Sequence, residues 1–519
     1  MADINFEDIQ PFVEGQGDSG LTARQKIKRN FESVRNFVKN KLPQLAEGEH
    51  DLSVSDDKGY VVIKVEGGDI KTKKFDSSKI NQSINKTCYV SKNGSDSNTG
   101  TLESPFGTVT HALDCGYHNV IVRGGLYYET IDFSKADGEI KIISYPTEEV
   151  IFMLGEIFPQ GTLYQNDIYY VTTSSPDVRN IFQYKVDDVD TYIDNDKRHP
   201  LQGKKVCRCD CQRLKKVNSI ELLVDNSFCY VDGKVYYKTI NPVNNSNFLF
   251  YGKNVSLINN TKQCDITLVG INVYGGKIET IDTQLFTAID CSAKYGKRGF
   301  FNITSLAFKL IRCEAARVEV GSSSPTLGDG IGTTRNTFSG TIDHPVQTME
   351  IIDCWSHDNW QDGYSSHYLS QVTIKGGVYE FNCYGGYGSS GAEDGGGIVP
   401  SLGSSDIVEG CIVQYNNING VKYSTTNTVA YGNYGVAIFK DVISRYNKRH
   451  GFFINAPNVG IIEFINCQAY GNTLKGFYIK NAVHVRLSGC KVYGNGTDYT
   501  NESQAIIVNQ SLNELNTNT

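Results

Sequence analysis

The sequence predicts an all-β solenoid, in which short strands coil about one axis and successive coils stack. Short apolar runs separated by Gly, Asn and Asp turns continue from about residue 120 to residue 510 without a long helical pattern. The composition agrees: 51 Gly, 31 Tyr and 24 Phe stand against 3 Met, and aromatic residues and glycine suit strands and tight turns.

Columns of like residues recur through the C-terminal third. One column is Asp358, Asn416, Asn447 and Asn472, and a second is Gly363, Gly420, Gly451 and Gly476. A third is Cys354, Cys411, Cys467 and Cys490, with Val442 at the same place in the coil between. Cys467 and Cys490 are 23 residues apart, which suits one three-stranded coil with ~5 residues per strand. We expect an Asn ladder and an interior row of structural cysteines.

The length, composition and net charge of the chain exclude several classes of function. The chain has 519 residues, a hydrophobic fraction of 39% and a charged fraction of 21%, as folded proteins do. A net charge of -7 argues against nucleic acid as a main partner. The start MADINFEDIQPF lacks the features of a signal peptide, and no apolar run reaches the ~18 residues of a membrane span. We therefore expect synthesis in the cytoplasm, reduced cysteines and no membrane partner.

Residues 1–50 are expected to form an N-terminal segment with one helix over residues 21–42. Thr22 and Gln25 have the spacing of a capping box. Apolar side chains then recur at Ile27, Phe31, Val34 and Val38. This seam of about two heptads favours tail docking or oligomerisation, and packing on its own domain is an equal alternative.

Residues 51–80 alternate apolar and polar side chains around two turns, which predicts a small β module. The stretch resembles the short "DxxGxxxxxxxxGxIxT" modules near the N-termini of phage tail proteins, and with the helix the resemblance covers about residues 20–80. It implies a virion tail protein whose N-terminus docks to other tail or baseplate proteins. A homotrimer is expected on this interpretation.

The stretch YVSKNGSDSNTGTLESPFGTVTHAL, residues 89–113, predicts a strand, a solvated turn and a short helix near Thr108 to Leu113. The open end of a solenoid exposes strand edges and core, so it needs a cap. We expect Val109, Ala112 and Leu113 to cover the first coil.

With VIVRGGLYYE after it, the same stretch resembles the start of the pectate-lyase-like right-handed parallel β-helix family. Together with the columns, the resemblance covers about residues 86–510. It implies a right-handed parallel β-helix and an action on acidic or complex polysaccharides. Between about residues 155 and 265 the periodicity weakens, which predicts a hairpin insertion. Residues 511–519 remain as a C-terminal tail.

The polar segments HDNWQDGYSSH and SSGAEDGGGIVP contain the candidate catalytic residues. Asp362 and Asp394 are aligned at one coil position, where they would lie ~5 Å apart in adjacent coils or ~10 Å apart two coils away. Glu393 and His367 complete the catalytic candidates. The substrate-binding candidates are His357, Asp358, Trp360 and Tyr364.

A turn without catalytic function is the alternative, because Asn419, His450 and Lys475 occupy the same column and Asp before Gly is common in turns. A lyase would need a base such as His367, Lys375 or Tyr364. The run VCRCDCQ brings together Cys207, Cys209 and Cys211, but zinc sites usually combine C-x2-C pairs. No metal or cofactor is therefore predicted.

Three functions remain open. The first is a phage tail-associated spike or receptor-binding protein, located in the virion tail, that recognises host surface polysaccharide and has an optional depolymerase activity. The second is a stand-alone polysaccharide lyase, hydrolase or epimerase, against which the missing export signal argues. The third is a non-catalytic structural tail or baseplate component.

Overall fold

The computed structural model describes residues 54–57, 60–65, 68–73, 87–174, 178–186, 188–189, 207–261, 264–319, 328–333, 347–366, 370–384, 395–401, 404–424, 436–457, 461–482, 484–503 and 506–510. The chain divides into two compact units, Met1–Asn85 and Lys86–Thr519. Among the residues described, no helix is both long and apolar enough to cross a lipid bilayer.

The first unit contains an antiparallel sheet of three strands, β1 (Val54–Asp57), β2 (Tyr60–Val65) and β3 (Gly68–Lys73), in that order. Consecutive strands pair antiparallel, as the alternating pattern predicts. The helix expected over residues 21–42 and the tail 511–519 lie outside the described residues.

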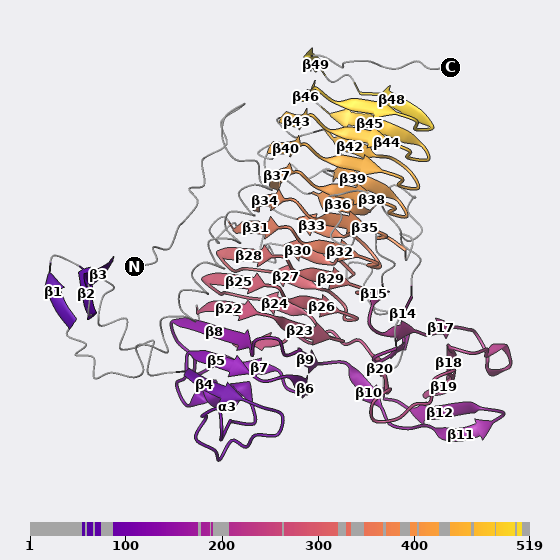
Figure 1. Cartoon of the computed structure of the whole chain (residues 1–519). Coiled ribbons are helices and arrows are strands. Elements are labelled where there is room, and N and C mark those ends of the chain that lie inside the picture. The colour runs from indigo at the N-terminus through magenta and orange to yellow at the C-terminus, as the bar shows by residue number, and fades with distance from the viewer. Residues whose placement is uncertain are drawn as a thin grey trace. The chain divides into compact units, whose positions relative to one another are not determined.

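Three parallel sheets run along the second unit, and their strands stack one above another (Figure 1). In the described part of the chain the first sheet has thirteen strands: β4 (Thr87–Val90), β5 (Asn119–Val122), β8 (Glu139–Ser144), β22 (Asp265–Val269), β25 (Leu285–Ile289), β28 (Ala307–Ile311), β31 (Thr348–Ile352), β34 (Gln371–Lys375), β37 (Ser405–Glu409), β40 (Val436–Lys440), β43 (Ile461–Ile465), β46 (His484–Ser488) and β49 (Ile506–Gln510).

Over the same described ranges the second sheet has eleven strands: β6 (Gly125–Tyr127), β9 (Val150–Met153), β23 (Ile271–Tyr274), β26 (Ser292–Lys294), β29 (Glu314–Ala316), β32 (Trp355–His357), β35 (Val378–Glu380), β38 (Ile412–Gln414), β41 (Ile443–Arg445), β44 (Gln468–Tyr470) and β47 (Lys491–Tyr493). The third has nine within them: β24 (Ile278–Thr280), β27 (Phe300–Asn302), β30 (Ile331–Thr333), β33 (Tyr364–Ser366), β36 (Gly396–Pro400), β39 (Asn419–Ser424), β42 (Phe452–Ala456), β45 (Lys475–Ala482) and β48 (Thr497–Asn501).

Within the described residues, each coil from β22 to β48 contributes one strand to each sheet, and the strands pair in register. In β31, for example, Met349 and Ile351 are buried while their neighbours face outward, because side chains alternate across a strand. Stacked apolar residues from all three sheets form one continuous core. The unit is the all-β, right-handed parallel β-helix that the sequence predicts.

The cysteine row is an interior feature. Cys354, Cys411, Cys467 and Cys490 all lie in the core, and Val442 fills the same slot, as predicted. Cys291 and Cys313 extend the row. The residue before each row member has a left-handed backbone conformation, as at Asp353 (φ 51°) and Asn466 (φ 52°). Asn, Asp and Gly tolerate this conformation, which explains their frequency before the row.

An asparagine ladder follows five residues after the row. Asn416 Nδ2 donates to Asn447 Oδ1 at 3.0 Å, and Asn447 Nδ2 donates to Asn472 Oδ1 at 2.9 Å. The predicted column was wrong at one place, because Asn359 is the ladder member and donates to Asn382 Oδ1. Asp358 lies one residue earlier, in the left-handed turn (φ 53°).

The expected cap is present. Helix α3 (Val109–Asp114) has Thr108 as its N-cap, whose side chain accepts a hydrogen bond from the His111 N–H. Val109, Ala112 and Leu113 are buried and belong to the continuous core, so the helix covers the first coil as predicted.

Antiparallel strands fill the segment between β9 and β22. One sheet has the order β10 (Glu156–Phe158), β20 (Leu249–Tyr251), β13 (Phe182–Gln183), β16 (Gln212–Arg213). A second has the order β11 (Thr162–Gln165), β12 (Ile168–Thr172), β19 (Lys234–Lys238), β18 (Ser227–Val231), β17 (Lys215–Lys216). The other elements of this segment are η1 (Ile220–Leu222), the pair of β14 (Asp188–Val189) and β15 (Cys207–Cys209), and β21 (Ile258–Asn259). Strand β21 pairs in parallel with β7 (Ile131–Asp132), which precedes β9 in the chain. We call the residues from Glu156 to Tyr251 the insertion.

Candidate functional site

Charged side chains gather on the outer face of the second sheet. Residues one and three positions after the cysteine row point outward, because the residue between them points into the core. In successive coils these positions hold Lys294, Glu314, Trp355, His357, Glu380, Gln414, Arg445 and Tyr470. We call this row of side chains, together with Asp358 and Asp210, the outer strip.

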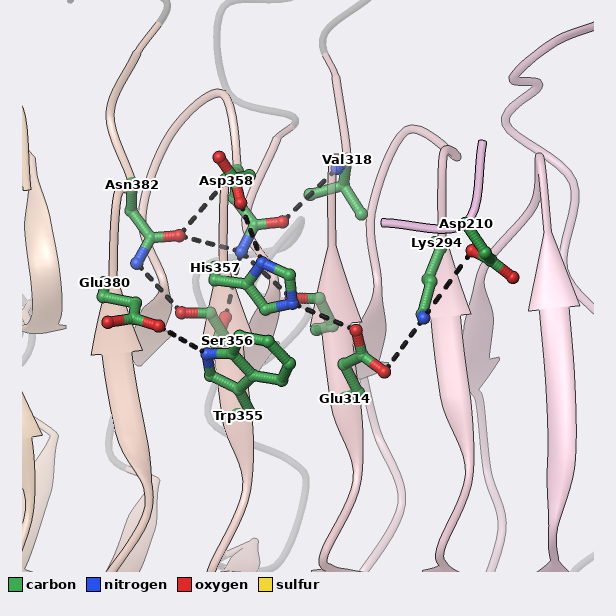
Figure 2. Close-up of polar contacts among 12 residues, drawn as sticks. Asp210, Lys294, Glu314, Val318, Trp355, Ser356, His357, Asp358, Glu380 and Asn382 are labelled. Atoms are coloured by element: carbon green, nitrogen blue, oxygen red, sulfur yellow. Dashed lines mark hydrogen bonds and ion pairs between the residues drawn. The ribbon is translucent and has the colours of Figure 1, made fainter. Parts of the chain in front are cut away.

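His357 is held between two carboxylates (Figure 2). Its Nδ1 lies 2.9 Å from Asp358 Oδ2, and its Nε2 lies 3.0 Å from Glu314 Oε1 on the neighbouring strand. Burial lowers the pKa of His357, but the hydrogen bonds and charges of the two carboxylates raise it further, so the net shift is upward. A protonated imidazole that donates from both nitrogens satisfies this arrangement.

Lys294 extends the strip toward the insertion. Its Nζ lies 2.9 Å from Glu314 Oε2 and 3.9 Å from Asp210 Oδ1. Asp210 also accepts hydrogen bonds from the hydroxyls of Tyr274 and Tyr295. Although burial raises it, the charges of Lys294 and His357 lower the pKa of Glu314 to about 2. Glu314 is therefore an ionised carboxylate at neutral pH.

Trp355 connects the two halves of the strip. Its ring stacks on His357 with centroids 3.8 Å apart, and its Nε1 donates to Glu380 Oε1 at 2.9 Å (Figure 2). Gln414 then bridges Glu380 and Arg445, with distances of 2.8 and 2.7 Å. The contacts run across successive strands and thus along the axis of the coil stack.

The exposed fractions of the side chains show which residues of the outer strip a ligand can contact. The side chains of Glu314 and Asp358 are 25% and 13% exposed, whereas that of His357 is 0% exposed. Glu380 and Gln414 are also fully buried. The carboxylates at the Glu314 end can therefore meet a ligand, and His357 positions them from below.

A second acidic cluster lies where the chain turns into the third sheet. Because Ile331 pairs with Tyr364, Asp329 and Asp362 occupy equivalent places in adjacent coils. Both are buried. Burial and the neighbouring Asp329 charge raise the pKa of Asp362, and burial raises that of Asp329 to about 6. The residue equivalent to Asp362 in the next coil is Gly396, whose N–H donates to Asp362 Oδ1 at 2.9 Å.

The predicted site residues therefore fall in three places. His357 and Asp358 belong to the outer strip, and Trp360 packs edge-on against Tyr384 beside it, with centroids 5.5 Å apart. Tyr364 lies inside the core, where its hydroxyl donates to Asp406 Oδ1, out of reach of a ligand on the outer face. Asp394, Glu393 and His367 lie outside the described residues.

Lys294, Glu314, Glu380 and Arg445 were missed from the sequence, although a signal exists. Lys294, Glu314 and Arg445 lie one or three residues after a position of the cysteine row, so the row marks them as outward residues. Glu380 lies three residues after Gly377, which only strand pairing places in the row, between Cys354 and Cys411. Asp329 was not among the candidates from the sequence, because the register between its coil and that of Asp362 was unknown.

No cluster of three or more metal-ligating side chains occurs within the residues described. Cys211 is buried among aromatic side chains of the insertion, while the side chains of Cys207 and Cys209 lie outside the described set.

Comparisons with known proteins give fold-level likeness. No family model matches the sequence. The uncharacterized protein YwoF of Bacillus subtilis (strain 168) is 44% identical over 68 residues, a match that spans 12% of this chain and only 14% of that protein.

Three solved structures illustrate the likeness. The alignment with a glycoside hydrolase covers 80% of this chain and 96% of the hydrolase chain, with 11% identity and a TM-score of 0.47. Pectate lyase Pel9A covers 81% and 80%, with 12% identity and a TM-score of 0.38. The tailspike gp49 of Acinetobacter baumannii bacteriophage Fri1, a capsular polysaccharide depolymerase, covers 88% and 70%, with 9% identity and a TM-score of 0.31.

Because these identities and TM-scores are low, the fold is identified from the topology of the chain itself. Three parallel sheets in register, an interior cysteine row and an asparagine ladder provide that identification. Outside the insertion, the described residues between 87 and 510 form a right-handed parallel β-helix.

Proposed function

We propose that the outer strip binds a polysaccharide chain lying along the coil stack and that the protein hydrolyses it. One observation carries the proposal: His357 fixes two partly exposed carboxylates, Glu314 and Asp358, on the outer face beside the indole of Trp355. Most glycoside hydrolases use a pair of carboxyl groups as catalytic residues. Such residues need supporting contacts that hold their side chains in place, as His357 does here.

The two partly exposed carboxyl groups have separate roles. Glu314, with its pKa lowered to about 2, remains ionised and is the base that activates water. Hydrolysis also needs a proton donor. Asp358 lies 2.9 Å from the imidazole of His357, whose pKa is raised, and it passes a proton from that imidazole to the leaving group.

The charges of the outer strip favour a neutral polysaccharide as the substrate. The accessible end of the strip has three carboxylates, Asp210, Glu314 and Asp358, against two cations, Lys294 and His357. A lyase acting on uronates would need a surplus of cations to neutralise the substrate carboxylate. Hydrolysis of a neutral glycan fits this balance better than elimination does.

The test is depolymerisation of a panel of bacterial capsular and cell-wall polysaccharides, measured as a shift to shorter chains in size-exclusion chromatography and as new reducing ends. Glu314→Gln and Asp358→Asn should each reduce the rate by at least about 100-fold. The matched control is Glu350→Gln on the first sheet, whose exposed carboxylate pairs with Lys309 and should not matter.

The outcomes separate the alternatives. Ultraviolet absorbance from unsaturated uronates would indicate a lyase and contradict hydrolysis. Binding of a polysaccharide without any shortening of its chains would support recognition and contradict the proposed hydrolysis. Neither binding nor cleavage of any polymer in the panel would favour a structural spacer.

We also propose that the protein is located in a phage tail, as a spike or receptor-binding component. The order of elements supports this: a small β module, β1 to β3, whose sequence resembles modules of phage tail proteins, precedes the β-helix in the chain. Mass spectrometry of purified particles that contain the chain as a stoichiometric tail component would support it. Its absence from such particles would contradict it.

A further inference from the structure

The insertion contains a cavity of about 450 Å³. It lies at the ends of β12 and β19, and its lining includes Tyr169, Tyr237, Lys238, Asp167 and Asp225. Small-molecule sites have volumes of ~300–1,000 Å³. The cavity thus has room for a ligand of one or two sugar rings. None of its lining residues belongs to the outer strip.

One tyrosine offers its ring to the cavity. Tyr169 and Tyr237 are cross-strand partners, and their rings stack with centroids 5.9 Å apart and an interplanar angle of 23°. Tyr237 is 1% exposed and its hydroxyl accepts a hydrogen bond from the Gly161 N–H at 3.0 Å, so it holds the partly exposed ring of Tyr169 in place. Aromatic side chains that combine an apolar face with a polar tip suit the mixed surface of a sugar ring.

The polar part of the lining determines which sugars fit. Asp225 Oδ1 lies 3.4 Å from Lys238 Nζ, so an acceptor and a donor stand side by side, as paired hydroxyl groups require. With Asp167 the lining has two carboxylates and one ammonium group. This excess of negative charge disfavours uronates, sulfates and phosphates.

We infer that this cavity is a second carbohydrate site, which binds a neutral mono- or disaccharide independently of the outer strip. Tyr169 provides the stacking surface, Tyr237 packs against it, and Asp225 and Lys238 bind hydroxyl groups. The cavity lies on the insertion, apart from the residues of the outer strip, and its proposed role is binding alone.

Saturation-transfer NMR on the full chain tests the inference with three probes, maltose, lactose and cellobiose. At least one should receive saturation from the wild-type protein. Tyr169→Ala, and separately Asp225→Asn, should weaken that binding about tenfold or more. The Asp225 side chain is 57% exposed, so its replacement leaves the fold intact even if Tyr169→Ala does not.

The control is Tyr164→Ala. Tyr164 is exposed on the same insertion and contacts Tyr236, whose cross-strand partner Tyr170 is on the face opposite Tyr169. This variant should bind the disaccharide as the wild type does. Absence of transfer to all three probes would overturn the inference, and so would equal binding by wild type and Asp225→Asn.

Discussion

The backbone N–H of Asp362 lies 3.4 Å from Oδ1 of Asp329 in the preceding coil, so two buried carboxyl groups share one corner of the β-helix. Burial raises the pKa of both, that of Asp329 to about 6. A carboxyl group in an unfolded chain has a pKa of about 3.9. As the pH rises, the unfolded chain loses these protons before the folded protein does.

We therefore predict that the stability contributed by these protonated groups is present below pH ~4 and is lost as the pH rises through their raised pKa values, which for Asp329 is about 6. Asp362→Asn should be about neutral at pH 4 and stabilising at pH 8. Thermal unfolding at both pH values measures this. Asp353→Asn, at an exposed turn, is the control and should change little. Greater destabilisation by Asp362→Asn at pH 8 than at pH 4 would contradict the prediction.

The asparagine ladder should be a major source of stability. Asn447→Ala removes the acceptor for both the backbone N–H and the side-chain amide of Asn416, at 3.1 and 3.0 Å. Each buried donor left unpaired costs about 1–3 kcal/mol, so we expect a loss of about 3–5 kcal/mol in urea unfolding. Asn495→Ala, at the part-buried end of the ladder, should cost clearly less. Equal losses at the two positions would argue against the ladder as a cooperative element.

Tryptophan fluorescence should report ligand binding directly. The chain has 2 tryptophans, and Trp355 and Trp360 both lie at the site. We expect polysaccharide to change the emission of the wild type and of Trp360→Phe. Trp355→Phe should lose most of the change, because Trp355 packs on His357 in the strip. A signal that disappears only with Trp360→Phe would place the ligand beside Tyr384 instead.

The N-terminal unit should assemble or dock the protein without supporting the β-helix. We predict that the full chain is a homotrimer and that deleting residues 1–80 weakens assembly while the thermal transition of the β-helix is retained. The second unit has its own continuous core, which supports the second part. Light scattering that finds full-length monomers at micromolar concentration would contradict the trimer.

The sequence predicted the repeating features of the fold and few of its individual contacts. Cysteines, glycines and asparagines recur because each coil presents the same slot, so the cysteine row and the cap helix were found correctly. The register was the weak point. Alignment by residue type placed Asp358 in the asparagine column, although Asn359 forms the hydrogen bond.

The same weakness affected the acidic pair. Matching Asp362 to Asp394 relied on their similar Gly contexts, yet strand pairing brings Asp329 beside Asp362 on one side and Gly396 on the other. Coil lengths vary because the turns between strands vary. Which carboxyl groups meet is therefore decided by the three-dimensional register and cannot be read from local spacing.

The most direct test of the account is a crystal structure of the Glu314→Gln variant with an oligosaccharide from the polymer that the wild type cleaves. We predict sugar rings that lie along the second sheet across β26, β29 and β32, with one ring within hydrogen-bond distance of residue 314 or Asp358. An oligosaccharide bound only on the first or third sheet, or only in the insertion, would contradict the account.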